Sequence, residues 1–230
     1  MTPARRMEPE WLDAMAQDDP RGMRSRRDLA RLNAIMSHAR WIAAPLREAR
    51  PVRIAEIGAG DGGFALRLAA ALPAPSSGAE LVLLDRAAAP SEGTMSEIAA
   101  RGWPARPVRA DVFDWLSDPA TPRFDAIVAN LFLHHFDDER LAGLLELAGN
   151  RTDLFVACEP RRSNLALASS RLVGLLGCND VTRHDAVASV RAGFSGDEIS
   201  RLWRARGWIL EETPCGLFSH RFVARRHAAV

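Results

Sequence analysis

The sequence predicts an α/β fold in which a mostly parallel β-sheet lies between two layers of helices. Short apolar runs of strand length alternate with helical patterns between residues 52 and 160. Such alternation is typical of a parallel sheet joined by right-handed crossovers. Four of the apolar runs end in a polar residue, and in a parallel sheet these ends meet at one edge. That edge is where folds of this class bind their ligands.

The expected strands are apolar runs bounded by turn residues. They cover residues 52–57, 80–85, 107–111, 124–132 and 154–160, and helices are expected between them at 62–72, 91–101 and 137–150. Two further strands, 208–213 and 217–224, flank the turn Pro214-Cys215-Gly216 and should form an antiparallel hairpin. The last strand is therefore expected to run against the others.

Fifty residues precede the first strand, and many of their apolar positions follow helical spacing. An amphipathic helix is expected over residues 28–46, with its apolar face formed by Leu29, Leu32, Ile35, Met36, Trp41 and Ile42. Trp11, Leu12 and Met15 indicate a shorter helix upstream. We expect residues 1–50 to form an N-terminal helical cap and residues 51–230 to form the main domain.

The segment 163–194 follows the fifth strand and is too apolar for a solvated loop. Its apolar residues are Leu165, Leu167, Leu172, Val173, Leu175 and Leu176. A ligand crevice at the strand ends needs a roof, so this segment is expected to be a lid over the acceptor site, with Leu172 and Leu176 in contact with the acceptor. Ordinary helix packing against the sheet explains the same pattern equally well.

The composition is that of one globular domain, with 230 residues, 47% hydrophobic and 26% charged. A net charge of +1 gives no general attraction to nucleic acid or to an anionic membrane. The arginines near the N-terminal helix are therefore interpreted as its solvated face: Arg21, Arg24, Arg26, Arg27 and Arg31. The expected partner is a small molecule, and no nucleic acid or membrane partner is predicted.

The three cysteines, Cys158, Cys178 and Cys215, are widely spaced. An odd number without paired ligand spacing argues against a disulfide framework and against a zinc site, so no metal site is predicted. No apolar run has the length of a signal peptide core or a membrane span. These features predict a cytoplasmic protein, with a homodimer as the candidate assembly.

The segment Glu56-Ile57-Gly58-Ala59-Gly60 joins the first strand to the first helix through glycines. Gly58 and Gly60 can adopt backbone angles closed to other residues, and they let a ligand approach the main chain. Together with Gly63 they match the spacing of dinucleotide-binding loops, but that spacing alone is weak evidence. Dinucleotide sites also need an acidic residue about 20 positions further on, and here the next strand ends later, at Asp85.

Glu56 favours a different ligand, because it places a negative charge beside this loop. A carboxylate there suits a ligand that has an ammonium group and no phosphates. S-adenosylmethionine has an α-amino group, a sulfonium and a ribose, so it fits this turn better than a nicotinamide dinucleotide does. The alternative is that Glu56 is only a solvated charge at the end of a strand.

The next strand ends supply the further contacts that this ligand requires. Asp85 ends the second strand and is expected to accept hydrogen bonds from both ribose hydroxyls. Asp111 is expected to accept from the adenine amino group, while Val112 packs on the ring. Asn130 lies at the end of the fourth strand.

These segments, together with residues 130–136, resemble the motifs of Rossmann-like class I S-adenosylmethionine-dependent methyltransferases. The resemblance spans residue 52 to about residue 224. It implies a three-layer Rossmann-like sandwich with a seven-stranded sheet whose last strand is antiparallel. The implied cofactor-binding residues are Glu56, Gly58, Ala59, Gly60, Asp85, Arg86, Asp111, Val112, Asn130 and Leu131.

Five further segments are similar to bacterial small-molecule methyltransferases found beside type III polyketide synthases. These segments are residues 27–33, 129–145, 159–162, 177–185 and 190–194. The similarity implies an aromatic polyketide or phenolic-lipid acceptor but says nothing about the atom that is methylated. Oxygen is the expected atom, with carbon and nitrogen left open. The alternatives are methylation of RNA or protein, a cofactor-binding protein without transferase activity, and a nicotinamide enzyme.

The cofactor brings its own electrophile, so a general base is optional. A phenol has a pKa of about 10 and is mostly neutral, so a histidine can assist by removing its proton. The candidates are His134, His135, His184 and His220. His135 and His184 are favoured, His184 with Asp185 beside it, and each can instead be structural. Arg31 is a candidate for the methionine carboxylate of the cofactor, and Arg161 for a carboxylate on the acceptor.

Overall fold

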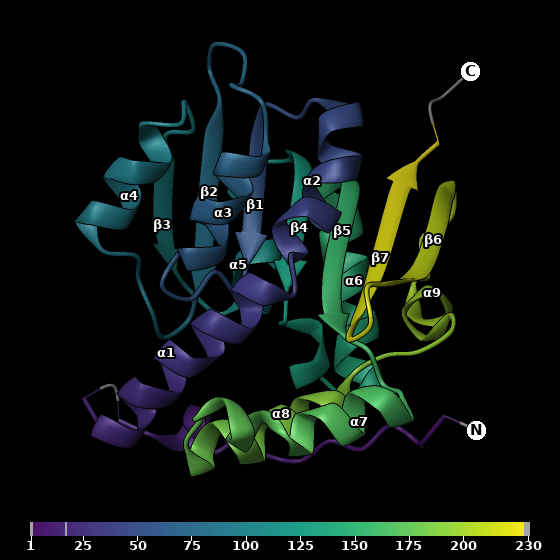
Figure 1. Cartoon of the computed structure of the whole chain (residues 1–230). Helices are drawn as coiled ribbons and strands as arrows, with labels where there is room; N and C mark the ends of the chain where they lie inside the picture. The colour runs from purple at the N-terminus through teal and green to yellow at the C-terminus, as the bar shows by residue number, and fades with distance from the viewer. Residues whose placement is uncertain (1, 17, 228–230) are drawn as a thin grey trace.

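The computed structural model describes residues 2–16 and 18–227, and its centre is a seven-stranded sheet (Figure 1). The strand order is β3-β2-β1-β4-β5-β7-β6. The bounds are β1 Arg53–Ile57, β2 Glu80–Asp85, β3 Ala105–Arg109, β4 Phe124–Asn130, β5 Thr152–Pro160, β6 Trp208–Cys215 and β7 Ser219–Arg226. Only β7 runs antiparallel to its neighbours, β5 and β6. The predicted fold class is confirmed.

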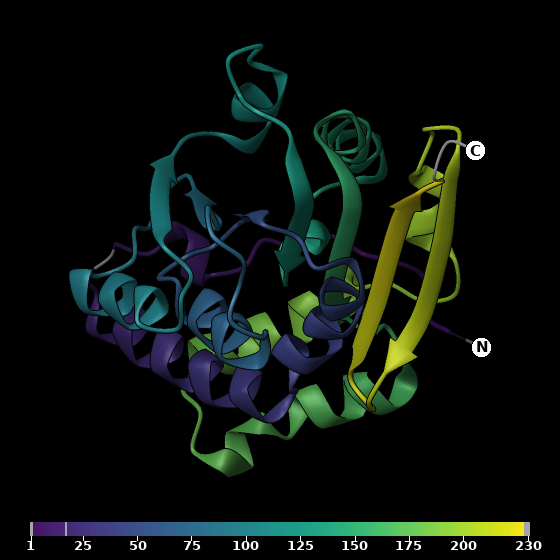
Figure 2. The ribbon, with the colours of Figure 1, turned by 90° about the horizontal axis from the view of Figure 1, so that it is seen from above.

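Helices cover both faces of the sheet (Figure 2). One face packs against α2 (His38–Ala49), α3 (Gly63–Ala71) and α4 (Glu92–Ala99), and the other against α5 (Val112–Ser117), α6 (Asp138–Arg151) and α9 (Glu198–Leu202). Each face has its own buried apolar cluster. Because both faces are covered, β1 and β4 are buried almost throughout, as is usual for central parallel strands.

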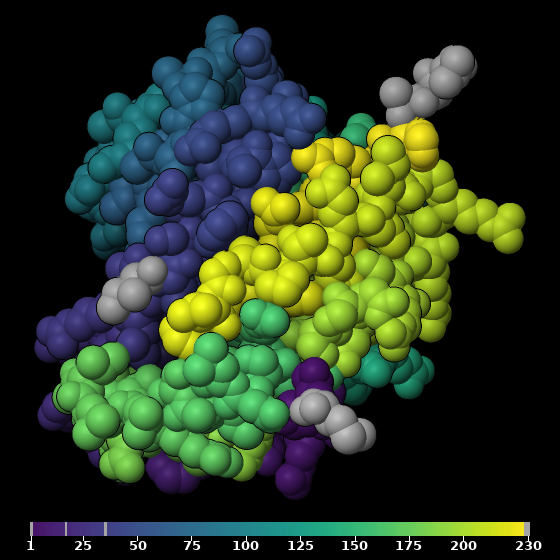
Figure 3. All heavy atoms as spheres, turned by 45° about the vertical axis from the view of Figure 1, so that its right-hand side comes forward, coloured from purple at the N-terminus to yellow at the C-terminus, as the bar shows by residue number. Residues whose placement is uncertain are grey.

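The remaining elements gather at the carboxyl ends of the parallel strands (Figure 1). They are η1 (Leu12–Ala14), α1 (Pro20–Ile35), η2 (Leu133–His135), α7 (Asn164–Arg171), η3 (Val173–Leu176) and α8 (Asp180–Ala192). The N-terminal segment, defined as residues 2–16, lies beside the lid segment 163–194 at this end of the molecule (Figure 3). Among the described residues, no helix is both long and apolar enough to cross a membrane.

Two elements differ from the sequence prediction. The expected strand 107–111 ends at Arg109, because Asp111 caps a helix: its Oδ1 accepts the N–H of Phe113 at 2.9 Å, and α5 begins at Val112. The expected helix 28–46 is two helices, α1 and α2, separated at Ser37, whose φ of 56° is left-handed. A residue in that conformation cannot continue an α-helix.

Candidate active site

A cavity of about 1380 Å³ lies at the carboxyl ends of β1, β2 and β4. One wall is formed by the strand ends and the loops that follow them. The facing wall is formed by the N-terminal segment, from Met7 to Met15. Predicted site residues on the cavity surface are Gly58, Asp85, Arg86, Asp111, Val112, Leu131 and His135.

The glycine loop after β1 has the conformation that its sequence predicts. Gly58 and Gly60 have φ values of 72° and 56°, in the region that favours glycine. A Cβ atom at Gly58 would overlap the ring of Phe132, which also faces the cavity. Any larger residue at this position would therefore displace a wall of the site.

Glu56 is a buried acid without a complete set of partners. Its side chain is 1% exposed, and its Oε2 has no hydrogen-bond partner among the described residues. Burial raises the pKa of Glu56 well above its usual value, although the charge of Arg67 opposes this. Glu56 lies behind the glycine loop, not on the cavity surface. A carboxyl with an unpartnered oxygen at this point fits a ligand that brings an ammonium group.

Asp85 links the glycine loop to the turn after β2. Its Oδ2 accepts the N–H of Gly60 at 2.9 Å, and its Oδ1 accepts the N–H groups of Ala87 and Ala88. An ionised carboxylate has about four acceptor positions, so three are already used. Asp85 therefore stabilises the conformation of the glycine loop and also faces the cavity.

Asn130 belongs to a buried hydrogen-bond chain that sequence reasoning did not identify. His38 donates from Nδ1 to the Asn130 Oδ1 at 2.7 Å, and its Nε2 lies 2.6 Å from the hydroxyl of Ser219. Burial lowers the pKa of His38, which suits a neutral ring with one donor and one acceptor. The Asn130 side chain thus fixes α2 against the end of β4, and the next residue, Leu131, faces the cavity.

Glu159, at the end of β5, is completely buried beneath the cavity. It accepts the backbone N–H groups of Phe132 and Leu133 at 3.0 and 2.9 Å, and its Oε2 lies 2.7 Å from Nδ1 of His134. The Nε2 of His134 lies 3.5 Å from Glu10, in the N-terminal segment. His134 therefore lies between two carboxylates that are far apart in the sequence, Glu10 and Glu159.

Charge in this group is set by competition between burial and ion pairing. Burial alone would lower the pKa of His134, but hydrogen bonds and charge from Glu10 and Glu159 raise it to about 9. Burial opposes ionisation of Glu10, yet His134 brings its pKa down to about 2. No sequence pattern marks Glu10 as a site residue, because it lies in a polar segment far from every strand.

His135 faces the cavity beside Asp13, with 3.7 Å between its Nδ1 and the Oδ2 of Asp13. Burial and the neighbouring charge of His134 lower the pKa of His135. The ring therefore favours its neutral form, which has a free lone pair. That lone pair can accept either a proton or a metal ion.

His184 is not on the cavity surface, and its contacts are structural. Its ring stacks on Trp11, with 4.0 Å between centroids, and its Nδ1 lies 3.0 Å from Asp185. Asp185 is buried and accepts the backbone N–H groups of Trp11 and Leu12. These residues of α8 hold the N-terminal segment in place.

The structure also does not bring four other candidates to the cavity. Arg31 is 79% exposed and lies 3.8 Å from Asp28. Leu172 and Leu176 are 57% and 67% exposed, because α7 and η3 lie on the outer side of the N-terminal segment and α8. Arg161 pairs through its backbone with Phe218. The surface that faces the strand ends is supplied by the N-terminal segment instead.

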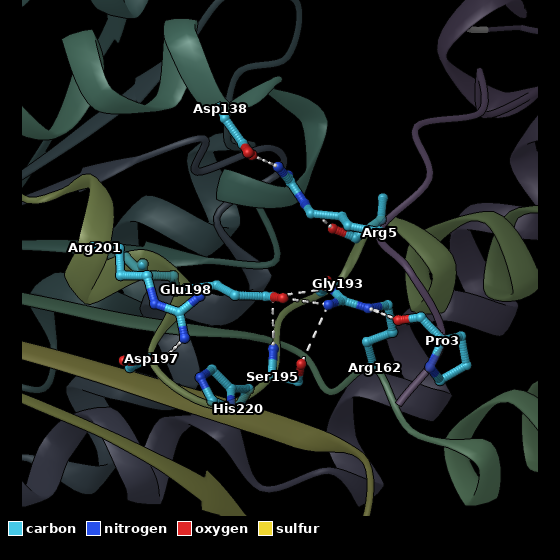
Figure 4. Close-up of polar contacts among 12 residues, drawn as sticks. Pro3, Arg5, Asp138, Arg162, Gly193, Ser195, Asp197, Glu198, Arg201 and His220 are labelled. Atoms are coloured by element: carbon cyan, nitrogen blue, oxygen red, sulfur yellow. Dashed lines mark hydrogen bonds and ion pairs between the residues drawn. The ribbon is translucent and has the colours of Figure 1, made fainter. Parts of the chain in front are cut away.

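Arginines anchor this segment at its start (Figure 4). Arg5 donates to Asp138 at 2.5 Å and to the carbonyl of Phe136 at 2.8 Å. Arg162 forms an ion pair with Glu198 and donates to the carbonyl of Pro3 at 2.7 Å. The roof of the cavity is thus fastened to α6, to the end of β5 and to α9.

Residues 54–151, which run from β1 to α6, match a family model described as a methyltransferase domain. A comparison with curated protein sequences finds no match. The family match confirms the predicted enzyme class, a methyltransferase. The fold and the cavity are those expected for one that uses S-adenosylmethionine.

Solved structures with the same fold include the plantazolicin methyltransferase BpumL in complex with SAH, at 14% identity and a TM-score of 0.64, covering 91% of this chain and 92% of that chain. The mitomycin 7-O-methyltransferase MmcR is 19% identical, with a TM-score of 0.61. The match covers 94% of this chain and 60% of that chain. An O-methyltransferase family protein from Burkholderia thailandensis is 15% identical, with a TM-score of 0.63 and coverage of 93% and 62%.

Proposed function

We propose that this protein transfers a methyl group from S-adenosylmethionine to a small-molecule acceptor, most often on an oxygen atom of a phenolic or polyketide-type compound. The observation that carries the proposal is the cavity at the strand ends. There Gly58 of the glycine loop and the carboxylate of Asp85 line the cavity, and the buried, unpartnered oxygen of Glu56 lies behind the loop. The match of residues 54–151 to a methyltransferase domain supports the reaction class.

The cofactor is assigned to the part of the cavity between the glycine loop and α5. Asp85 would accept a ribose hydroxyl with its remaining acceptor position. Asp111 has one oxygen occupied as the helix cap, and its other oxygen is available to the adenine amino group. Val112 is buried at the cavity edge and offers an apolar contact to the ring.

The acceptor is assigned to the part of the cavity beneath the N-terminal segment. S-adenosylmethionine supplies an electrophilic methyl group when it is bound, so the protein must align the acceptor and exclude water. Phe132, Phe136 and Leu12 give this end apolar surface, while Glu10 and His135 give it polar groups. Such a mixed lining suits an aromatic compound with a hydroxyl group.

Two structural neighbours carry acceptors in their names, plantazolicin and mitomycin, and both are small molecules. A small acceptor is also favoured by the net charge of +1, which gives no field for nucleic acid. We further propose that the N-terminal cap 1–50 closes the acceptor side and that the segment 163–194 supports it through α8. We also propose that the protein acts in the cytoplasm, with a homodimer as the assembly to test.

Methyl transfer with labelled S-adenosylmethionine tests this proposal directly. The acceptors offered are a panel of phenolic polyketides, total RNA and cell protein, and binding of SAH is measured in parallel by calorimetry. We expect label in a phenolic compound and SAH binding that is weakened in Asp85→Asn. Label only in RNA or protein would replace the acceptor class, and NADH binding without SAH binding would refute the proposal.

A further inference from the structure

Three side chains on the acceptor wall of the cavity bring metal-ligating atoms together. Glu10, His134 and His135 each offer one ligand atom, and these atoms all lie within 4.8 Å of one another. Ligands of one first-row metal ion, each about 2.0–2.2 Å from it, are separated by distances of this order. All three residues line the cavity. The cluster therefore faces the space assigned to the acceptor.

The surroundings of His134 are those of a metal-ligating histidine. Metal-bound histidines usually donate their other ring N–H to a carboxylate, which fixes the tautomer and the ring orientation. Here Nδ1 lies 2.7 Å from the completely buried Glu159, whose other contacts are backbone N–H groups. Nε2 is thereby directed toward Glu10, 3.5 Å away. That separation is longer than the 2.7 Å contact to Glu159 and suits two ligands of one ion.

Glu10 and His135 are also oriented from outside the cluster. The hydroxyl of Ser189 donates to Glu10, and the Asp13 carboxylate lies 3.7 Å from Nδ1 of His135. Including Asp13 and Glu159, the group holds three carboxylates and two imidazoles. A divalent cation would offset most of the negative charge that these carboxylates carry.

We propose that Glu10, His134 and His135 bind a divalent metal ion of the zinc or manganese type. Two imidazoles and one carboxylate form a mixed nitrogen and oxygen donor set, which suits these ions and leaves further coordination positions open. An open position faces the cavity. Resting on the proposed function, the ion would bind the acceptor oxygen there and lower the pKa of its proton, which passes to the carboxylate of Asp13 on the same wall. The methyl carbon then forms its bond to this oxygen as its bond to the cofactor sulfur breaks, and SAH leaves.

The binding test uses Co²⁺ as a coloured probe on the full chain. Metal is first removed with a chelator, and Co²⁺ is then titrated while the visible absorption is recorded. We expect one Co²⁺ per chain with d–d bands, and at least about tenfold weaker binding in Glu10→Gln and in His135→Gln. His227→Gln, which removes an exposed histidine at the end of β7, is the matched control and should bind as the original does.

Circular dichroism confirms that each variant is folded, and Zn²⁺ and Mn²⁺ are tested as competitors of Co²⁺. No Co²⁺ spectrum in the original chain would overturn the proposal. Equal Co²⁺ binding in the folded Glu10→Gln and His135→Gln variants would overturn it as well, because the ion would then lie elsewhere.

A second arm separates this inference from the proposed function. Methyl transfer and SAH binding are measured before and after chelation and again after Zn²⁺ or Mn²⁺ is restored. We expect methyl transfer to fall at least about tenfold on chelation and to return with metal, with SAH affinity unchanged. Full methyl transfer by metal-free protein would overturn the metal role and leave the proposed function intact. Loss of SAH binding in every sample would instead refute the proposed function.

Discussion

The buried carboxyl of Glu56 indicates a ligand that has an ammonium group. Transferring an ionised group out of water is costly unless a partner compensates it. Glu56 has an unpartnered oxygen and a pKa raised well above its usual value by burial, so the free protein favours its protonated form. A ligand ammonium nearby would favour the ionised form instead.

This coupling predicts that SAH binding releases protons from the protein. Because the ligand favours ionised Glu56, affinity should rise with pH up to the raised pKa of Glu56 and level off above it. Stability of the free protein should change in the opposite sense, falling as pH rises from 4.5 toward that raised pKa. Calorimetry of SAH binding in two buffers of different ionisation enthalpy measures the released protons.

The matched variant for this experiment is Glu56→Gln, which keeps the shape of the side chain and removes its titration. It should bind SAH more weakly and with the same heat in both buffers. Equal heats in the original chain would show that Glu56 does not respond to the ligand.

Asp85 ends β2, whereas Asp111 caps α5, so their contacts differ and so should their substitutions. In Asp85→Asn one oxygen becomes a donor, so either the contacts to Ala87 and Ala88 or those to Gly60 and a ribose hydroxyl are lost; each such charged hydrogen bond is worth about 1.5–3 kcal/mol. In Asp111→Asn the remaining oxygen can still cap α5. We expect SAH affinity to fall about 10- to 100-fold in Asp85→Asn and less than about tenfold in Asp111→Asn. Calorimetry decides this, with thermal unfolding as the control for folding, and equal losses would contradict it.

At the scale of elements, the sequence was informative wherever burial alone decides the structure. The central strands β1, β2 and β4 are apolar on both faces, and the pattern located them within two residues. The helix α5 was missed because a cap at Asp111 outweighs an apolar run that resembles a strand. The break at Ser37 was missed because helical periodicity continues across it, and only tertiary packing requires the turn.

The helix α8 is the element that holds the N-terminal segment, and Asp185 is its central contact. Asp185→Asn should weaken the bonds to the backbone of Trp11 and Leu12, because an amide nitrogen cannot accept them. We expect faster trypsin cleavage at Arg5 and Arg6 and a higher KM for the acceptor, with a smaller change in SAH affinity.

Asp180→Asn is the control for this variant, because Asp180 lies on the same helix, is exposed and forms an ion pair with Arg21 and not with the N-terminal segment 2–16. A cleavage rate in Asp185→Asn that equals that of Asp180→Asn would contradict the proposed anchoring.

His184→Ala should lower kcat by less than about tenfold, since His184 is not on the cavity surface. A loss of about 100-fold or more would return it to a catalytic role.

At the scale of the whole molecule, the two sides of the cavity differ in how far the sequence predicts them. The cofactor side follows from strand ends, because parallel strands bring their carboxyl ends to one edge. The acceptor side joins Glu10 to His134 and Trp11 to Asp185, residues more than a hundred positions apart. No local pattern encodes such contacts. The sequence therefore predicts the lid segment 163–194 over the acceptor site, where the structure has the N-terminal segment.

The different make-up of the two sides of the cavity predicts the effect of deleting residues 2–16. Among the described residues, none before Ala39 belongs to either buried apolar cluster, so the sheet and its helices should still fold. Glu56, Asp85 and Asp111 remain in place, so SAH should bind within about tenfold of its original affinity. The acceptor wall and Glu10 are lost, so methyl transfer should fall at least about 100-fold. Thermal unfolding, SAH calorimetry and methyl transfer on the same samples test this together. Methyl transfer that survives the deletion would show that the acceptor binds elsewhere, and loss of SAH binding with a folded chain would place the segment in the cofactor site.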